Sequence, residues 1–368
     1  MRILSLDGGG IRGVLTARVL ERLQRACPGF LDHVDVIAGA STGGIQALKL
    51  ASGGHVGELA GLYEQRGKDI FRPRDWLDVL PKSVRIGAPV TLLVVASALA
   101  ALHYYTAAVI VSVVLGVGMI ALNLFAKLDE LWRADYSHEY LEAVLKDELG
   151  TDATLRDLNK IVLIPTFDQR TWNTKFFDTF PGNERDLDQR LWEVARCTSA
   201  APTYWPSHQW CLDGGLFANN PSDSAVAACL RFLREKHMQE DADLQGLGRD
   251  EAYEQATARS LGQITVLSLG TGEVPHPAPP DPTNDVGILY MIPMLLNVVM
   301  DGAVKASTFR TSQCLNGRHV RVQPKLPAVI DLADLDAIPE LLQIADLVDL
   351  EDAVALIRNY WLPKKEAA

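Results

Sequence analysis

A serine between two glycines is the first feature of the sequence that could do chemistry. Residues 39–43 read Gly-Ala-Ser-Thr-Gly and match the G-x-S-x-G pattern, with Gly39 and Gly43 on either side of Ser41. An apolar run over residues 34–38 precedes them and a helical pattern over residues 45–51 follows, and in this context a sharp turn exposes a serine hydroxyl. The positive end of the helix would lie beside that hydroxyl. The pattern predicts Ser41 as an acyl-transfer nucleophile, with a purely structural Gly-Ser-Gly turn as the alternative.

A glycine-rich segment lies directly after the first apolar run of the chain. Residues 7–13 read Asp-Gly-Gly-Gly-Ile-Arg-Gly. Consecutive glycines expose backbone N–H groups that can converge on a carbonyl oxygen as it becomes an oxyanion. We therefore predict an oxyanion hole made by Gly8, Gly9 and Gly10, and a supporting role for Arg12 in binding a phosphate or steadying the loop.

The same glycines also fit a second interpretation. Residues 8–13 satisfy G-x-G-x-x-G, and Asp32 follows at about the twenty-residue spacing of the dinucleotide-binding fingerprint. Nucleotide binding would leave the serine turn unexplained, so we keep it as the lesser alternative.

An acid stands in a third glycine-rich turn, where Asp213 precedes Gly214 and Gly215. A serine nucleophile needs a base. Histidine is the usual base, but none of the eight histidines lies in a motif. On this pattern alone, Asp213 is either a plain turn residue or the missing base.

These motifs need secondary structure to position them. Short apolar runs at residues 3–6, 34–38, 161–164 and 264–269 are each followed by turn residues, and helical patterns separate them. Such runs are typical of buried strands in a sheet that helices cover on both faces. The sequence therefore predicts an α/β fold.

The composition excludes several other classes of protein. The chain has 368 residues, of which 48% are hydrophobic, and a formal net charge of −11. Such a chain can bury a sizeable core, and an acidic chain without clustered Lys and Arg argues against a nucleic-acid partner. The five cysteines are widely spaced and lack a C-x-x-C pattern. We therefore expect no metal, no cofactor and a reducing compartment.

One long apolar segment does not fit a soluble α/β domain. The 41 residues 86–126 contain no Asp, Glu, Lys or Arg, whereas a helix that spans a bilayer needs about 20 apolar residues. We predict a transmembrane helical hairpin with its midpoint near His103; one span plus a re-entrant segment, or two buried core helices, are the alternatives. Positive residues flank both outer ends. We therefore expect both flanks, and the catalytic domain with them, to lie on the cytoplasmic side of the membrane.

Taken together, the three motifs resemble those of the patatin-like phospholipases. The resemblance extends from residue 2 to about residue 226, with weaker similarity at residues 266–272 and 318–324. It implies a three-layer α/β/α fold related to the α/β hydrolases, and a serine–aspartate dyad without histidine. Ser41 would be the nucleophile and Asp213 its general base. The residues that match the oxyanion loop and its supporting turns are Gly8, Gly9, Gly10, Arg12, Gly39, Gly43, Gly214 and Gly215.

The resemblance and the apolar segment together set the expected organisation. A catalytic domain over residues 1–274 is interrupted by the hairpin at 86–126, and residues 275–368 form a mainly helical extension packed on that domain. We expect a phospholipase A or lysophospholipase that cleaves fatty-acyl esters of membrane phospholipids. The resemblance is to the bacterial type of the family, so we expect the membrane to be a bacterial inner membrane. The family leaves room for a homo-oligomer and for an activating partner or small signal molecule. A catalytically silent, membrane-anchored scaffold is the alternative from another class.

Overall fold

The computed structural model describes residues 1–74, 134–275 and 288–363. The chain divides into two compact units. The larger unit consists of Met1–Phe71, Glu139–Pro202 and Ser207–Ala368, and the smaller one of Arg72–His138 and Thr203–Pro206. Within the smaller unit, the rings of Tyr136 and Tyr204 stack with 5.9 Å between their centroids.

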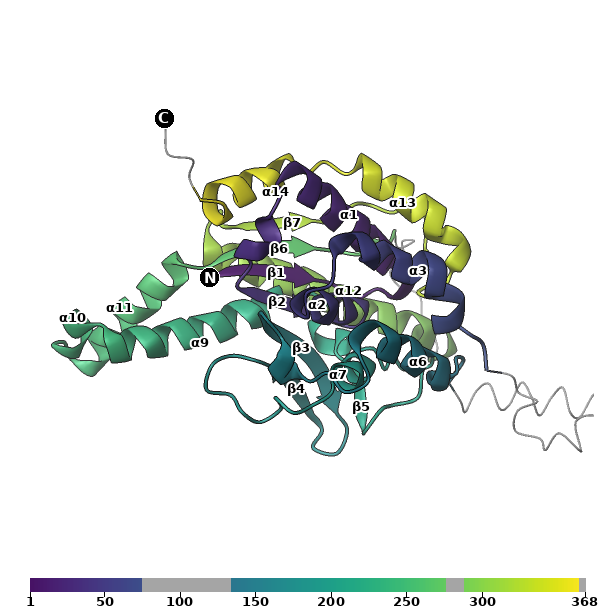
Figure 1. Ribbon diagram of the computed structural model, residues 1–368, viewed down its shortest axis with the longest axis horizontal. Helices are drawn as coiled ribbons and strands as arrows, with labels where there is room; N and C mark the ends of the chain where they lie inside the picture. Colours follow the sequence, from purple (N-terminus) through teal and green to yellow (C-terminus); the bar gives the residue numbers. More distant parts are fainter. Residues whose placement is uncertain (75–133, 276–287, 364–368) are drawn as a thin grey trace, which may run out of the picture. The chain divides into compact units, whose positions relative to one another are not determined.

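A seven-stranded sheet forms the centre of the larger unit (Figure 1). The strand order is β4-β3-β2-β1-β6-β7, and β5 pairs with β3 outside this path. The pairings from β3 through β2, β1 and β6 to β7 are parallel, whereas β4 and β5 both run antiparallel to β3. The strands are β1 (Arg2–Leu6), β2 (Val36–Gly39), β3 (Ile161–Asp168), β4 (Asn173–Asp178), β5 (Cys211–Asp213), β6 (Thr265–Leu269) and β7 (His319–Val322).

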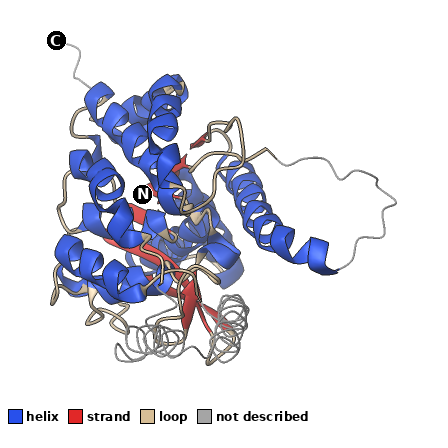
Figure 2. Ribbon diagram, turned by 90° about the vertical axis from the view of Figure 1, so that its right-hand side faces the viewer, coloured by secondary structure: helices blue, strands red, loops and turns tan. Residues whose placement is uncertain are grey.

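Helices cover both faces of this sheet, as Figures 1 and 2 show. On one face, Ile3, Val36 and Val266 form a buried cluster with apolar side chains of α9, among them Val226. The α-helices of the larger unit are α1 (Gly13–Ala26), α2 (Thr42–Ala51), α3 (Val56–Ile70), α6 (His138–Leu149), α7 (Leu191–Thr198), α8 (Gly215–Ala218), α9 (Ser222–Glu240), α10 (Ala242–Gln245), α11 (Arg249–Gly262), α12 (Ile288–Leu315), α13 (Ile338–Leu347) and α14 (Glu351–Leu356). Because both faces are covered, the central strands are buried along nearly their whole length and do not alternate between buried and exposed residues.

The central strands end together at one edge of the sheet. Leu6, the last residue of β1, pairs with Gly39 on β2 and with Leu269 on β6. All three strands are parallel, so this edge carries their carboxyl ends. The segments that follow them, which begin at Asp7, Ala40 and Gly270, therefore leave the sheet side by side.

The predicted α/β sheet with helices on both faces is confirmed, and three of its strands were not foreseen. β4 is polar and partly exposed, β5 has three residues, and β7 reads His-Val-Arg-Val, so none shows a buried apolar run. Residues 288–363 supply β7 to the same sheet, together with α12 to α14. The domain boundary at residue 274 stays a prediction.

The apolar segment at residues 86–126 lies outside the described residues. Among the residues that are described, no helix has the length and apolar character that a membrane span requires. The transmembrane hairpin therefore stays a prediction.

Candidate active site

The serine turn connects β2 to α2. Ser41 has φ 51° and ψ −123°, an uncommon conformation for a residue other than glycine. A Cβ atom at Gly39 would lie 2.2 Å from the carbonyl oxygen of Gly43, and one at Gly43 would lie 2.3 Å from the carbonyl oxygen of Leu6. Only glycine fits either position, and this explains the two flanking glycines of the motif.

The turn brings Ser41 against an aspartate from a distant part of the chain. The Oγ atom of Ser41 donates a hydrogen bond of 2.7 Å to Oδ2 of Asp213. β5 places this aspartate, because Asp213 pairs with Thr166 on β3, the strand next to β2. The second carboxylate oxygen, Oδ1, accepts the N–H of Gly215 at 2.6 Å. Both carboxylate oxygens therefore have a donor.

The surroundings of Asp213 make it a stronger base than an ordinary aspartate. Its side chain is buried, and this burial raises its pKa to about 6, although the donors from Ser41 and Gly215 act in the opposite direction. An exposed aspartate has a pKa near 3.8. A carboxylate with a pKa of about 6 accepts a proton from serine more readily and is still ionised at neutral pH.

Thr198 connects the two partners. Its Oγ1 accepts the backbone N–H of Ser41 at 3.1 Å and donates to the carbonyl oxygen of Pro165 at 2.6 Å. Its own carbonyl oxygen accepts the N–H of Gly214 at 3.2 Å. This fully buried threonine thus fixes both the serine turn and the aspartate turn. Sequence reasoning missed it, because it lies in no motif.

The glycine loop follows β1 and passes beside the serine. A Cβ atom at Gly8 would lie 3.1 Å from Cβ of Ser41. The N–H of Gly8 donates to the carbonyl oxygen of Asn219 at 3.0 Å, so this group already has an acceptor. Within the described residues, no acceptor faces the N–H groups of Gly9 and Gly10. Of the three predicted donors, these two are available to a ligand.

Thr271 holds the peptide group that joins Gly8 to Gly9. Its Oγ1 donates to the carbonyl oxygen of Gly8 at 2.8 Å, and Nδ2 of Asn219 donates to the same oxygen at 3.4 Å. In a trans peptide the C=O and the following N–H point in opposite directions. The two donors therefore fix the direction of the Gly9 N–H.

Arg12 closes the far end of the glycine loop. Its backbone N–H donates to the carbonyl oxygen of Gly9 at 3.1 Å, and its Nε lies 3.4 Å from the same oxygen. The arginine predicted to support the loop therefore contacts it.

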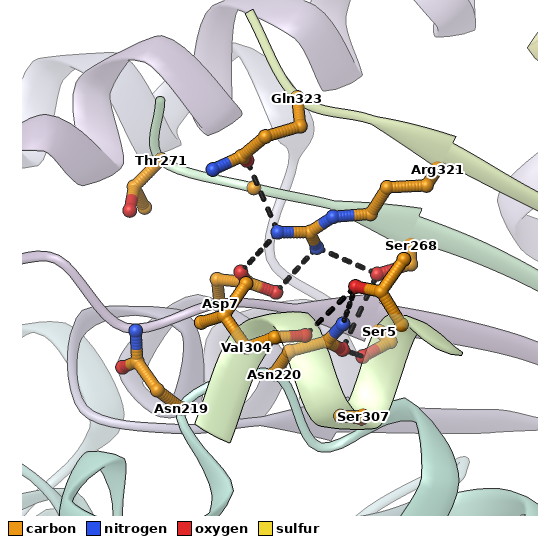
Figure 3. A network of polar contacts seen from close by, with 12 residues as sticks. Ser5, Asp7, Asn219, Asn220, Ser268, Thr271, Val304, Ser307, Arg321 and Gln323 are labelled. Carbon is orange, nitrogen blue, oxygen red and sulfur yellow. Dashed lines mark hydrogen bonds and ion pairs between the residues drawn. The ribbon is translucent and has the colours of Figure 1, made fainter. Parts of the chain in front are cut away.

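A buried ion pair anchors the start of the loop (Figure 3). Arg321 on β7 donates to both carboxylate oxygens of Asp7, at 2.7 and 2.5 Å, and also to Ser268 Oγ and Gln323 Oε1. Next to it, Oδ1 of Asn220 accepts hydrogen bonds from the hydroxyls of Ser5 and Ser268. Sequence reasoning assigned no role to Arg321, although the weaker similarity at residues 318–324 covers it.

The sequence model of the patatin-like phospholipase family matches residues 4–226, a range that includes the glycine loop, Ser41 and Asp213. The chain belongs to the patatin-like phospholipase family. The match covers the three motifs and the strands that position them.

Individual relatives agree with this membership. The chain is 30% identical over 250 residues to the cGAMP-activated phospholipase of Escherichia coli (strain TW11681), covering 64% of this chain and 57% of that protein. The cGAMP-activated phospholipase of Vibrio cholerae serotype O1 is 31% identical over 240 residues, which are 60% of this chain and 56% of the relative. Patatin-like protein 1 of Oryza sativa subsp. indica is 28% identical over 296 residues, which are 73% of this chain and 58% of that protein. The chain thus spans little more than half the length of these relatives.

The dinucleotide interpretation does not fit this patatin-like fold. In a dinucleotide site, the acid follows the second strand and lies at the same edge as the glycine loop. Asp32 instead lies in a short 3-10 helix over Phe30–His33, before β2 begins. It is therefore at the opposite edge of the sheet from Gly8, and the serine turn occupies the end of β2.

Among the described residues, no histidine forms a hydrogen bond with Ser41 or Asp213. The same part of the chain contains no group of three or more His, Cys, Asp or Glu side chains that could hold a metal ion.

Proposed function

We propose that this protein is a serine acyl hydrolase of the phospholipase A or lysophospholipase type, which cleaves fatty-acyl esters of phospholipids. The observation that carries the proposal is the 2.7 Å hydrogen bond from Ser41 Oγ to Asp213 Oδ2. The family membership and the strained turn at Ser41 support the same conclusion.

In the first step, Ser41 Oγ attacks the carbonyl carbon of the ester while Asp213 accepts the hydroxyl proton. The carbonyl oxygen becomes an oxyanion beside the N–H groups of Gly9 and Gly10 and the N-terminal end of α2. The C–O bond of the ester then breaks. The alcohol leaves with the proton from Asp213, and the acyl group stays on Ser41. This alcohol is a lysophospholipid when the substrate carries two acyl chains, and a glycerophosphodiester when the substrate is a lysophospholipid.

In the second step, Asp213 removes a proton from water, which attacks the acyl-enzyme. A second oxyanion forms in the same place and collapses to release the fatty acid, while Ser41 recovers its proton. Gly8 binds no oxyanion in this scheme, because its N–H is held by Asn219. Its role is to hold the loop beside Ser41. No cofactor takes part.

We also propose that the segment 86–126 anchors the protein in the bacterial inner membrane, with the catalytic domain on the cytoplasmic side. Its 41 residues without Asp, Glu, Lys or Arg support this. An anchor would raise the local concentration of substrate at the active site. The test is a chain in which residues 87–125 are replaced by a short linker. Unchanged membrane fractionation and unchanged activity on vesicles would contradict the anchor.

The names of two relatives suggest a regulator. Both are called cGAMP-activated phospholipases. We therefore propose that a small signal molecule activates this protein, and that assays should be run with and without cyclic dinucleotides.

The decisive experiment compares wild type with Ser41→Ala and Asp213→Asn on phospholipid vesicles, with product analysis by mass spectrometry. We expect fatty acid and lysophospholipid from the wild type and neither from the variants, which should keep the wild-type circular dichroism spectrum. Hydrolysis by Ser41→Ala would refute the proposed nucleophile. A wild type that neither hydrolyses lipid nor reacts with a serine-directed phosphonate would instead be a silent scaffold.

A further inference from the structure

Two tryptophans are exposed on neighbouring turns of the larger unit. Trp172 lies in the turn between β3 and β4 and is 81% exposed, and Trp210 lies directly before β5 and is 62% exposed. Indole rings bury well and dominate the energetics of cores and interfaces. Two of them on adjacent turns therefore call for an explanation.

The backbone makes these positions more unusual. His208 and Cys211 exchange two backbone hydrogen bonds, of 2.7 and 3.3 Å, around a two-residue turn. Both central residues have positive φ, 49° at Gln209 and 66° at Trp210. Turns of this kind favour Asn-Gly, because a bulky side chain is strained there.

Trp172 repeats the pattern in the neighbouring turn. Its φ is 51°, and the turn is closed by the paired residues Asp168 and Asn173. The sequence thus twice places an exposed indole where glycine or asparagine would relieve strain. Strain of this type is typical of functional sites.

Both turns lie beyond the dyad, at the edge where the strands carry their carboxyl ends. β3 is parallel to β2 and continues past their last pair, Ala38 with Leu163, as far as Asp168. Asp168 pairs with Cys211, which lies on β5 two residues before Asp213. Figure 1 shows the β3–β4 turn next to the start of β5, and the N–H of Gln169 donates to the carbonyl oxygen of Trp210 at 2.9 Å. The turns are therefore tied to each other and, through β5, to the base.

The charge on the two turns differs from that of the chain as a whole. Neither residues 169–172 nor residues 208–211 contain Asp or Glu, although the net charge is −11. Arg170 has a side chain that is 61% exposed, with its Nε 3.4 Å from Oδ1 of Asp168. An exposed guanidinium on the same turn as an exposed indole matches a surface of lipid phosphates.

We propose that Trp172, Trp210 and Arg170 form a bilayer-docking edge, in which the two indoles insert at the headgroup level of a phospholipid membrane and Arg170 contacts phosphate. Tryptophan prefers this depth because its ring is amphipathic. Docking by this edge would bring the ester bond of a bilayer lipid to Ser41. The inference rests on the proposed function, since it names how the substrate reaches that site.

A bilayer fits this edge better than a protein partner does. Two tryptophans bury at most about 500 Å², whereas a stable protein interface needs roughly 1,200 Å² or more in total. Insertion into a membrane needs no complementary pocket and uses a few aromatic anchors.

The test compares two activities of the full-length protein. One substrate is a dispersed short-chain ester, and the other is vesicles of equimolar phosphatidylethanolamine and phosphatidylglycerol. The ratio of vesicle to dispersed activity should fall about tenfold in Trp172→Ala or Trp210→Ala and on the order of a hundredfold in the double variant. The control is Tyr253→Ala, which removes an exposed aromatic ring on α11 and should leave the ratio unchanged.

Trp210→Gly separates docking from folding. Glycine relieves the strain at this turn, so the variant should have a Tm raised by about 1–3 °C, while its activity ratio falls as in Trp210→Ala. A purely structural role for Trp210 predicts the reverse, a lower Tm with an unchanged ratio.

Fluorescence makes the test independent of catalysis. The Ser41→Ala protein is mixed with vesicles of brominated phosphatidylcholine, which quench tryptophan fluorescence within the bilayer. We expect quenching in this protein, and much less quenching when Trp172→Phe and Trp210→Phe are added to it. Absence of this quenching would overturn the proposal even if the protein hydrolyses lipid. If quenching occurs but the wild-type protein hydrolyses no lipid, the proposed function is refuted and the docking edge is not. A change in oligomeric state of the double variant would show that the edge binds a second copy and would also overturn the proposal.

Discussion

Thr271→Val tests how the oxyanion loop is aimed. The substitution keeps the shape of the side chain and removes the hydroxyl that donates to the carbonyl oxygen of Gly8 at 2.8 Å. That oxygen then keeps only the Nδ2 donor of Asn219 at 3.4 Å. Because the peptide group is planar, any rotation of the Gly8 carbonyl also turns the N–H of Gly9, the proposed oxyanion donor.

The size of the effect follows from what the loop loses and what it keeps. A buried carbonyl without its donor loses about 1–3 kcal/mol, enough to favour a rotated peptide. Complete loss of one oxyanion donor lowers kcat by about 10²- to 10³-fold. Since Thr271 holds only the peptide group between Gly8 and Gly9, the substitution leaves the proposed donor at Gly10 untouched, and we expect kcat to fall by about 10- to 100-fold. KM should change little, because the oxyanion forms only after substrate has bound.

The assay is steady-state hydrolysis of a dispersed short-chain ester, together with the affinity of a trifluoromethyl ketone whose serine adduct carries an oxyanion. Both kcat and this affinity should fall by the same factor in Thr271→Val and recover in Thr271→Ser. Thr16→Val is the matched control, because Thr16 donates a similar bond of 3.1 Å to Gly270 and not to the glycine loop. A lower Tm with wild-type kcat in Thr271→Val, or an equal loss of kcat in Thr16→Val, would refute the reasoning.

Three further predictions concern the groups around the dyad. The pKa of Asp213 is about 6 in the folded protein and 3.8 as an ordinary aspartate. Because the base must be ionised, kcat/KM should rise with pH through about 6. Between pH 3.8 and 6 the folded state binds more protons than the unfolded state, so the unfolding free energy should fall by about 3 kcal/mol as the pH rises across this range. In thermal melts, Asp213→Asn should therefore stabilise the protein more at high pH than at low pH. Arg321→Met leaves the buried Asp7 carboxylate unpaired and should lower the unfolding free energy by about 3–5 kcal/mol in urea titrations, with partial recovery when Asp7→Asn is added. Thr198→Val removes the acceptor for the N–H of Ser41 and should lower unfolding free energy by about 1–3 kcal/mol, and it should slow phosphonate labelling of Ser41; wild-type labelling would contradict its positioning role.

Local sequence was enough to predict the parts of the site that depend on short-range geometry. The turn at Ser41 and the glycine loop at Gly8–Gly10 each follow a buried strand, and close backbone contacts set Gly39 and Gly43. Asp213 was different. Its strand has three residues and no periodicity, so its role could be predicted only through the resemblance to a family.

The residues that sequence reasoning missed act through tertiary contacts. Thr198 is 157 residues from Ser41, Thr271 is 263 residues from Gly8, and Arg321 is 314 residues from Asp7. A threonine or arginine at such positions gives no local signal. The two threonines fix the direction of backbone groups and Arg321 holds the carboxylate of Asp7, and a motif describes neither kind of contact.

The antiparallel strand β5 connects the proposed base to the proposed docking edge. The parallel strands deliver the glycine loop and Ser41 to the same edge of the sheet, whereas β5 runs against β3 and carries Asp213 inward from that edge. A register shift of one residue would turn Asp213 to the other face of the sheet. The tight turn at Gln209 and Trp210 starts β5 and sets this register. The same strained turn that exposes an indole therefore also fixes the carboxylate 2.7 Å from the serine.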